Sequence, residues 1–285
     1  MRIALLFLPA LALAQTPTTV PPPTPAPFVT HKLSAKVYYV EGGGGSSAVI
    51  VGKKGVVVVD VKTTAAGGKE LLESIAKITP LPVTTVIETH SDGDHVNGLV
   101  SFPKGITVIA HENCKKEEEA VIASGRGVLT AERLPTRVVS KDREVLQLEG
   151  EKFELLHWGP AHTNGDMIVY LPAEKIVFVG DIISPQQPWP IIHPEKNGST
   201  EGWLRTTRGM AALNSDQFIP GHGDVQTKAM IRKQLADAEA RRAKIQELVG
   251  QGKSLEEIRT AVGDPPARPR FVSYTEAVYA EVTKK

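Results

Sequence analysis

The amino-acid sequence predicts an α+β protein in which two mixed β-sheets pack face to face, with helices on the outer faces of both sheets. Two observations support this. Short runs rich in valine and isoleucine, separated by turn residues, recur between residues 35 and 219. Segments whose apolar residues have helical spacing follow the strands in both halves of that region. Both patterns are expected if each sheet packs against the other sheet on its inner face and against helices on its outer face.

In the first half of the chain, we expect a set of antiparallel strands followed by helices. Gly42–Gly45 supplies the turn between the first two strands. The segment 66–79 places Leu71 and Ile75 on one helical face, and Pro80 ends that helix. The expected elements are strands at 35–41, 47–52, 55–61, 83–89 and 106–110, and helices at 66–79 and 112–124.

The second half repeats the alternation of strands and helices. A long charged helix at 225–249 places Ile231, Leu235 and Ile245 roughly on one face. The expected strands are 136–140, 144–149, 152–157, 166–171, 175–180 and 216–219, and the other expected helices are 200–213 and 254–262.

The composition limits the class of protein. The chain has 285 residues, 33 Lys+Arg against 32 Asp+Glu, 41% hydrophobic residues and one cysteine. The balanced charge argues against a protein that binds nucleic acid through its phosphates. One cysteine allows neither an internal disulfide nor a multi-cysteine zinc site. These features predict an enzyme or a binding protein whose partner is a small molecule, and they carry no indication of oligomeric state.

The N-terminal residues predict export. Residues 1–14 combine Arg2, an apolar stretch and an Ala-x-Ala end, as in a secretory signal peptide. Residues 15–29 are rich in proline and threonine and predict an extended tether. We therefore expect a periplasmic or secreted protein whose residues 30–285 form a single domain with C-terminal helices. Cleavage lowers the cationic count from 33 to 32, equal to the anionic count. No later apolar run reaches the roughly 20 residues that stable membrane insertion needs.

The segment Thr89-His90-Ser91-Asp92-Gly93-Asp94-His95 places four potential metal ligands directly after a predicted strand. A loop at a strand end lets such side chains converge on one point. Imidazole nitrogens together with carboxylate oxygens suit zinc, iron or manganese better than calcium or magnesium. Taken alone, the segment is equally compatible with a solvated polar loop.

Three later residues add potential ligands at strand ends. His162 lies in a glycine-containing turn between two predicted strands, and Asp181 follows the apolar strand at 175–180. His222 follows the strand at 216–219, between two glycines that allow close backbone approach. Because loops at strand ends gather into a cleft, these residues predict a metal site together with the earlier segment.

From about residue 33 to 249, this ordered set of motifs resembles the metallo-β-lactamase superfamily. The resemblance implies a four-layer αβ/βα sandwich with a one- or two-metal site at the sheet edge. It implies two divalent metal ions, with zinc favoured and iron or manganese as alternatives. By position in the family pattern, the first metal site would comprise His90, Asp92 and His162, the second would comprise Asp94, His95 and His222, and Asp181 would bridge the two metals.

Asp92 departs from the family motif, which is normally His-x-His-x-Asp-His. A carboxylate in place of an imidazole gives three negative ligands against two divalent ions. More anionic ligation should raise the pKa of a bound water relative to an all-histidine site, and it makes iron or manganese more competitive with zinc. Alternatively, Asp92 points away from the site and only the second metal site is filled.

The resemblance implies an exported metal-dependent hydrolase with a dinuclear site. A metal-bound hydroxide would attack an ester, lactone, thioester or β-lactam amide bond of a small molecule. Asp94, His162 and His222 would be the catalytic residues, with Asp94 orienting the hydroxide while it binds metal. The set formed by Asp181 and Asp94-His95 is closer to the glyoxalase II and lactonase pattern than to lactamases with a cysteine ligand.

Two other classes of function remain open. The same fold with carboxylate-rich ligation could be a flavodiiron-like redox domain. A metal-binding protein with a weakened catalytic site, in which Asp92 is the first lost ligand, is the other alternative. Export and neutral charge disfavour nucleic-acid processing of the ribonuclease Z kind.

Two further features have no assigned role. His193 and Trp189 lie in the loop 185–199, which either forms a rim of the cleft or is an ordinary surface loop. Cys114 lies away from the ligand motifs in the sequence and is predicted to be a packed thiol.

Overall fold

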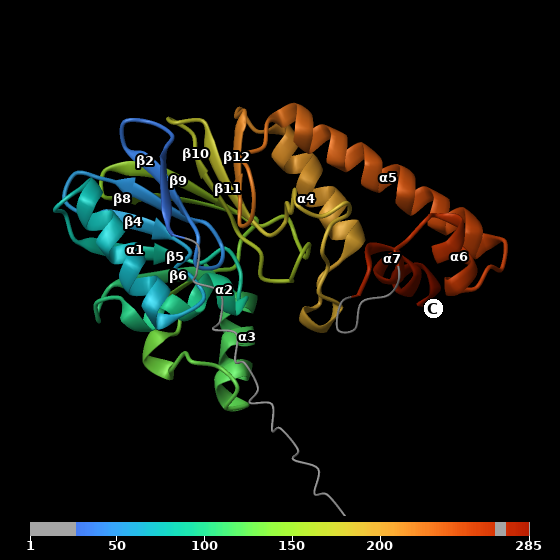
Figure 1. The fold of residues 1–285 in the computed structure, drawn as a ribbon, viewed down its shortest axis with the longest axis horizontal. Helices are drawn as coiled ribbons and strands as arrows, with labels where there is room; N and C mark the ends of the chain where they lie inside the picture. Colours follow the sequence, from blue (N-terminus) through green and yellow to red (C-terminus); the bar gives the residue numbers. More distant parts are fainter. Residues whose placement is uncertain (1–26, 266–271, 285) are drawn as a thin grey trace, which may run out of the picture.

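The structure is a computed structural model that describes residues 27–265 and 272–284. A seven-stranded sheet and a five-stranded sheet form the centre of the molecule, with helices on their outer sides (Figure 1). The predicted α+β fold with two mixed sheets in a four-layer αβ/βα sandwich is confirmed. The predicted signal peptide, residues 1–14, and the predicted tether up to residue 26 lie outside the described residues.

The strands of the first sheet lie in chain order. The first four strands pair antiparallel because short turns join them, and the remaining pairs are parallel. The parallel connections run through α1 (Ala65–Ile78), through α2 (Gly93–Val96) with the short helix η1 (Asn97–Ser101), and through α3 (Glu112–Ala123) with η2 (Ala131–Arg133). The strands are β1 (Val29–Lys32), β2 (Val37–Glu41), β3 (Ser47–Val51), β4 (Val56–Val59), β5 (Val83–Ile87), β6 (Thr107–His111) and β7 (Arg137–Val139).

The second sheet has the order β12-β11-β10-β9-β8. Its pairs are antiparallel except that β12 runs parallel to β11, because α4 (Thr200–Ala212) carries the chain back between them. The strands are β8 (Arg143–Leu148), β9 (Glu151–Leu156), β10 (Ile168–Leu171), β11 (Ile176–Gly180) and β12 (Gln217–Pro220).

Strand β4 shows why the layers form. All four of its valines are buried. Because side chains alternate along a strand, Val57 and Val59 enter the core between the sheets, and Val56 and Val58 enter the core beneath α1. A continuous apolar run is therefore what a strand covered on both faces needs.

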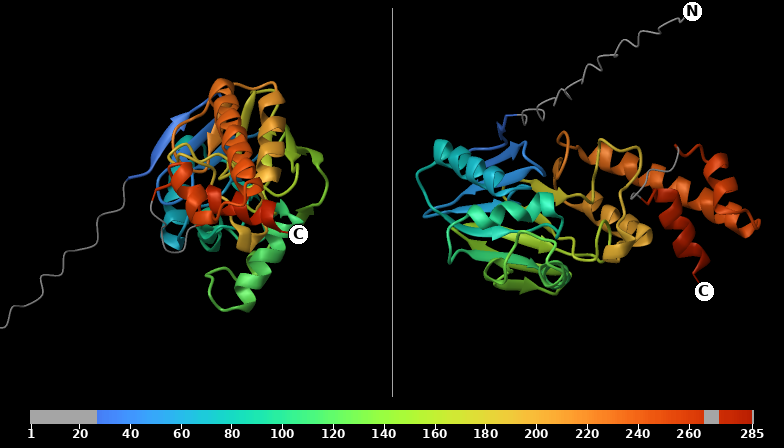
Figure 2. Two further views of the ribbon diagram at one scale, coloured as in Figure 1. Left: turned by 90° about the vertical axis from the view of Figure 1, so that its right-hand side faces the viewer. Right: turned by 60° about the horizontal axis from the view of Figure 1, so that its bottom comes forward.

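Helices also cover the outer face of the second sheet. Trp203 of α4 and Ile231 of α5 (Lys228–Gly250) belong to one buried cluster with Val177 and Val179 of β11. The helices α6 (Leu255–Ala261) and α7 (Tyr274–Thr283) lie at the far end of α5, away from the first sheet (Figure 2). Among the described residues, no helix is long and apolar enough to cross a membrane.

One strand joins a different sheet from the one its position suggests. The segment predicted at 136–140, which the sequence groups with the later strands, is β7, and it pairs with β6 of the first sheet. Residue periodicity identifies a strand but does not identify its neighbour, which depends on where α3 returns the chain.

Candidate metal centre

The predicted ligands gather at one edge of the sandwich, where loops follow β5, β9, β11 and β12. Two groups of three, which we call the first and second triads, each place one donor atom per residue within 4.8 Å of the others. The first triad is His90, Asp92 and His162, and the second triad is Asp94, His95 and His222. These are the two sets predicted from the sequence, and their role as ligands stays a prediction.

The first triad is nearly closed to solvent. Asp92 Oδ2 lies 3.2 Å from His162 Nε2 and 3.7 Å from His90 Nε2. Both histidines are buried. Donor atoms around a tetrahedral zinc ion with bonds of 2.0–2.1 Å are about 3.3 Å apart. The spacing in the first triad is close to that value.

The second triad is more open. His222 Nε2 lies 2.9 Å from Asp94 Oδ2, and His95 Nε2 lies 3.7 Å from the same oxygen. His95 is fully buried, but the side chains of His222 and Asp94 are 34% and 35% exposed. The second triad therefore faces the mouth of the site.

Asp181 lies where the predicted bridging residue should be. Its Oδ1 is 3.4 Å from His95 Nε2, and its Oδ2 is 3.6 Å from His222 Nε2. With His90 and His95, Asp181 forms a third group of converging donor atoms. One carboxylate is therefore within reach of histidines from both triads.

The donor atoms fit a cation. His90 Nε2, His95 Nε2 and Asp181 Oδ1 are buried and have no hydrogen-bond partner among the described residues. Unpaired buried polar atoms are costly, and a bound metal ion would satisfy all three. The site also needs space: a β-carbon on Gly221 would lie 2.1 Å from Asp181 Oδ1. These observations support a metal centre built from imidazoles and carboxylates.

The opposite ring nitrogen of each buried histidine has a protein partner. His90 Nδ1 lies 2.9 Å from Thr89 Oγ1, His95 Nδ1 lies 2.8 Å from Asp60 Oδ2, and His162 Nδ1 lies 3.0 Å from the carbonyl oxygen of Ile191. When Nδ1 donates its proton to these acceptors, the Nε2 lone pair is left for a metal.

Asp60 is a residue of the candidate site that the sequence did not identify. It is buried at the end of β4 and accepts hydrogen bonds from the Thr89 backbone nitrogen (2.8 Å) and from Thr89 Oγ1 (2.7 Å), besides its contact with His95. Through Thr89, Asp60 also supports His90. The available signal was a carboxylate that ends a run of four valines.

The loop 185–199 contacts the first triad. Of the two interpretations of this loop, the contact favours a rim of the site over an ordinary surface loop. The His193 backbone nitrogen donates to the carbonyl oxygen of His162 (2.9 Å), and His193 Nε2 lies 3.6 Å from Asp92 Oδ2. Lys196, which the sequence did not identify, forms an ion pair with Asp92 Oδ1 and donates to Ser91 Oγ (2.9 Å). Asp92 therefore points one oxygen to the triad and the other to a lysine.

The charges in the site keep its carboxylates ionised but affect its histidines in different ways. Burial and the charge of His95 lower the pKa of His90 to about 4. Burial opposes ionisation of Asp92 and Asp181, but the neighbouring histidines bring the pKa of both carboxyls well below the usual range.

The other three histidines behave differently. Burial opposes protonation of His162 and His95, but the hydrogen bond to Asp92 raises the pKa of His162 to about 9, and the charges of Asp181 and Asp60 raise the pKa of His95. The hydrogen bond to Asp94 raises the pKa of His222. Metal binding at these three histidines must displace a proton.

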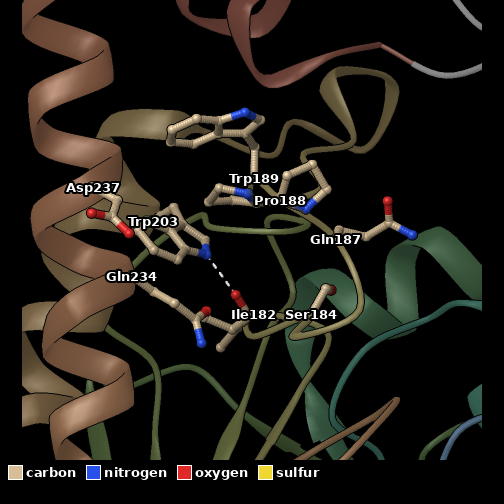
Figure 3. Close-up of a pocket in the computed structure, with 9 residues that line it drawn as sticks. Ile182, Ser184, Gln187, Pro188, Trp189, Trp203, Gln234 and Asp237 are labelled. Carbon is tan, nitrogen blue, oxygen red and sulfur yellow. Dashed lines mark hydrogen bonds between the residues drawn. The ribbon is translucent and has the colours of Figure 1, made fainter. Parts of the chain in front are cut away.

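Trp189 does not line the metal centre. Its ring stacks on Tyr274 of α7 with centroids 6.2 Å apart, and the Arg241 guanidinium lies 4.3 Å from its centroid. Figure 3 shows Trp189 and Trp203 around a small pocket beside α5. With a volume of about 40 Å³, this pocket has room for water rather than a substrate. Trp189 thus attaches the loop to the C-terminal helices.

Sequence comparisons place the chain in a family. The sequence model of the metallo-beta-lactamase superfamily matches residues 40–222. The chain is 31% identical over 142 residues to the 2,4-dinitroanisole O-demethylase subunit alpha of Nocardioides sp. (strain JS1661), covering 50% of this chain and 40% of that protein. It is 27% identical over 159 residues to metallo-beta-lactamase IND-1 of Chryseobacterium indologenes, covering 55% of this chain and 62% of that protein. The chain therefore spans less than two thirds of these relatives.

Solved structures show the same fold. The sec-alkylsulfatase Pisa1 from Pseudomonas sp. has a TM-score of 0.72 at 18% identity, covering 90% of this chain and 50% of that chain. A metallo-beta-lactamase from Pontibacter korlensis has a TM-score of 0.63 at 19% identity, covering 74% and 99%. With the match of the family sequence model over residues 40–222, these findings establish that the chain belongs to the metallo-β-lactamase superfamily.

Proposed function

We propose that this protein is an exported metal-dependent hydrolase that acts on an ester, lactone, thioester or β-lactam amide bond of a small molecule. One observation supports this above all. Three buried histidines have a protein acceptor at Nδ1 and direct Nε2 toward carboxylates at one sheet edge. Such an arrangement orients the Nε2 atoms toward a shared cation rather than toward a structural hydrogen-bond network.

The chain's own residues would hold two divalent ions, for which we favour zinc over iron or manganese. The first triad would hold one ion, the second triad the other, and Asp181 would contact both. Bound there, the ions would supply a nucleophilic water and polarise the scissile carbonyl group.

Asp94 is suited to orient a water at the mouth of the site. Burial opposes its ionisation, but the hydrogen bond to His222 and the charge of His95 lower its pKa, so the carboxylate is ionised at neutral pH. Its partial exposure puts it where a substrate enters. On the other side of the mouth, His193 is 25% exposed and lies beside Asp92, where it can contact a bound substrate.

The proposal is tested by measuring metals per chain and hydrolysis with the same preparation. The substrate panel contains nitrocefin, a lactone, a thioester, a phosphodiester and 2,4-dinitroanisole, the last taken from the name of a relative. Turnover that requires about two ions per chain is the expected result. Metal-loaded protein that hydrolyses nothing in the panel would contradict the proposed reaction class.

The carboxylate-rich donor set favours one second candidate, a redox site that holds iron. Three carboxylates, Asp92, Asp94 and Asp181, lie at the centre, and hard anionic ligands suit iron. Iron bound without hydrolysis, together with reduction of an oxidant, would favour this candidate. Zinc with hydrolysis would exclude it.

Export rests on the sequence of residues 1–14 and has a separate test. We expect protein isolated from its native host to begin at Gln15 and to be found outside the cytoplasm. Mass spectrometry of the intact chain measures the first point. An uncleaved chain that remains in the cytoplasm would contradict it.

A further inference from the structure

A second cluster of potential ligands lies behind the ligand motif, on the side of α3. Glu88 directly follows β5, two residues before His90, and Cys114 and Glu118 lie on α3. The three donor atoms are within 4.8 Å of one another. Cys114 and Glu118 are four residues apart, so a single helix face presents both toward the end of β5.

All three side chains are removed from solvent. Glu88 and Cys114 are 0% exposed, and Glu118 is 2% exposed. Within residues 27–265 and 272–284, neither glutamate forms an ion pair. Two buried carboxyl groups and a thiol thus share a pocket without an ion-paired cation, although the charge of Lys196 acts on Cys114 and Glu118 from nearby.

Glu88 is the most unusual member of the cluster. Neither of its carboxylate oxygens has a hydrogen-bond partner among the described residues, and Glu118 Oε2 is also unpartnered. An unpaired buried carboxylate costs several kcal/mol unless it binds a proton or a cation. The fold therefore leaves unsatisfied oxygen donors next to the single cysteine of the chain.

The spacing of the donor atoms suits a transition metal ion. Zinc binds sulfur at about 2.3 Å and carboxylate oxygen at about 2.0–2.2 Å, which puts sulfur and oxygen about 3.5 Å apart in a tetrahedral site. Cys114 Sγ donates a hydrogen bond to Glu118 Oε1 over 3.8 Å, a separation close to that value. A thiolate also selects zinc, iron or cobalt over magnesium or calcium.

We propose that Glu88, Cys114 and Glu118 form a separate, closed binding site for one divalent transition metal ion. The site shares no residue with either triad, and it does not depend on the proposed hydrolase function. A metal there would join the end of β5 to α3 and so support the loop that begins at Thr89. Its burial indicates a structural role, because no substrate can reach it.

Cobalt(II) is the probe that tests this site. A cobalt ion bound to a thiolate gives a charge-transfer band in the near ultraviolet, which imidazole and carboxylate ligands do not give. Because Cys114 is the only cysteine, such a band can come from no other residue. Metal is removed from the full chain with a chelator, and cobalt is added to the folded chain and, separately, during refolding, since the pocket is closed.

We expect the band in at least one of these preparations, saturating at about one cobalt ion per chain beyond those in the triads. The band should be lost in Cys114→Ser and strongly reduced in Glu88→Gln and Glu118→Gln. It should persist in Glu119→Gln, an exposed neighbour on α3, and in His95→Ala, which damages the second triad. Circular dichroism checks that each variant folds. If Cys114→Ser does not fold, the isosteric Glu118→Gln variant tests the site in its place.

Two results would overturn the proposal. One is the absence of the band in both preparations while the triads bind cobalt, which would mean that the cluster is held neutral by protons. The other is a band that survives in both glutamine variants, which would mean that Cys114 binds metal without the glutamates. Failure of the hydrolase proposal would not change how these two results are interpreted, because the cobalt band does not depend on turnover.

Discussion

The two triads contain the same donor types, two histidines and one aspartate, but their surroundings differ. In the second triad, His95 is fixed by the buried Asp60, and its two partners are partly exposed. In the first triad, both histidines are buried, and Asp92 shares its charge with Lys196. An equal set of donor types therefore does not imply equal affinity, because a cation next to one carboxylate weakens the attraction of that site for a metal.

Two lysines near the triads, Lys196 and Lys62, differ in the direction in which their pKa is shifted. Asp92 raises the pKa of Lys196 although burial opposes it. Lys62 lies beneath the loop that contacts His95. Within the part of the chain that the structure describes, it donates only to backbone carbonyl oxygens, those of Val40 (2.5 Å) and Gly45 (2.9 Å). Burial lowers the pKa of Lys62 to about 7. One lysine is charged beside the first triad, and the other is held close to neutrality below the second.

Removing a ligand from either triad should have the largest effect. His162→Ala and His222→Ala should each lower turnover about a hundredfold or more while the chain stays folded. Each should also lose about one metal ion, because each triad loses one of three ligands. Steady-state kinetics and metal analysis measure this, with His31→Ala on β1 as the control. Turnover close to that of the unmodified chain in either variant would refute the assignment of that triad.

Asp60→Asn should have the next largest effect. An asparagine keeps one acceptor oxygen where Asp60 accepts bonds from Thr89 and His95. We expect metal affinity or activity to fall about 10–100-fold. The comparison variant is Thr89→Val, which breaks the support of His90 but leaves the His95 contact. Thr89→Val should lower the metal affinity of the first triad more than that of the second. An equal loss of metal affinity in both triads would mean that Thr89 does not support His90 independently of His95.

Lys196→Met should increase the metal affinity of the first triad. Removing a positive charge beside Asp92 should tighten binding of the weaker-bound metal ion about tenfold, equivalent to about 1.4 kcal/mol. Competition with a chelating dye measures the affinity. Lys116→Met, at an exposed lysine of α3, is the control and should change nothing. Weaker binding in Lys196→Met would mean that the lysine chiefly positions Asp92.

Lys62→Met should change how stability depends on pH. Because burial lowers the pKa of Lys62 from 10.5 to about 7, the unfolded chain binds more protons than the folded chain between these values. The free energy of unfolding therefore rises with pH through that window, by up to about 1.4 kcal/mol per pH unit. The variant should lack this contribution.

Urea unfolding at about pH 7.5 and about pH 9.5 tests this expectation, and the unmodified chain should gain up to about 2.7 kcal/mol relative to Lys62→Met. Lys54→Met, at an exposed lysine, should follow the unmodified chain. Parallel pH profiles for all three proteins would show that Lys62 is charged in the folded state.

Much of the fold could be predicted because its signals are local. The valines of β4 and the spacing of Leu71 and Ile75 on α1 identified elements whose bounds the structure matches to within a few residues. The sheet to which β7 belongs could not be predicted, since pairing depends on the path of the chain after α3. The convergence of the triads was predictable because every ligand follows or precedes a strand at the same edge.

The neighbours of the ligands were not predictable in the same way. Asp60 is one carboxylate at a strand end, and no spacing relates it to His95, which is 35 residues later. Lys196 ends a short 3-10 helix, Pro194–Lys196, 104 residues after Asp92. Periodicity and residue type say nothing about such contacts.

The sequence by itself determined the fold class and the donor types of the candidate metal centre, because alternation, helical spacing and ligand chemistry are properties of short segments. Only the tertiary structure decided which charges surround those donors. It placed Lys196 on Asp92, joined His95 and Thr89 through Asp60, and brought Glu88 against Cys114 and Glu118. The physical reason is that electrostatic partners are set by distance in space, and distances between loops follow from how the two sheets pack.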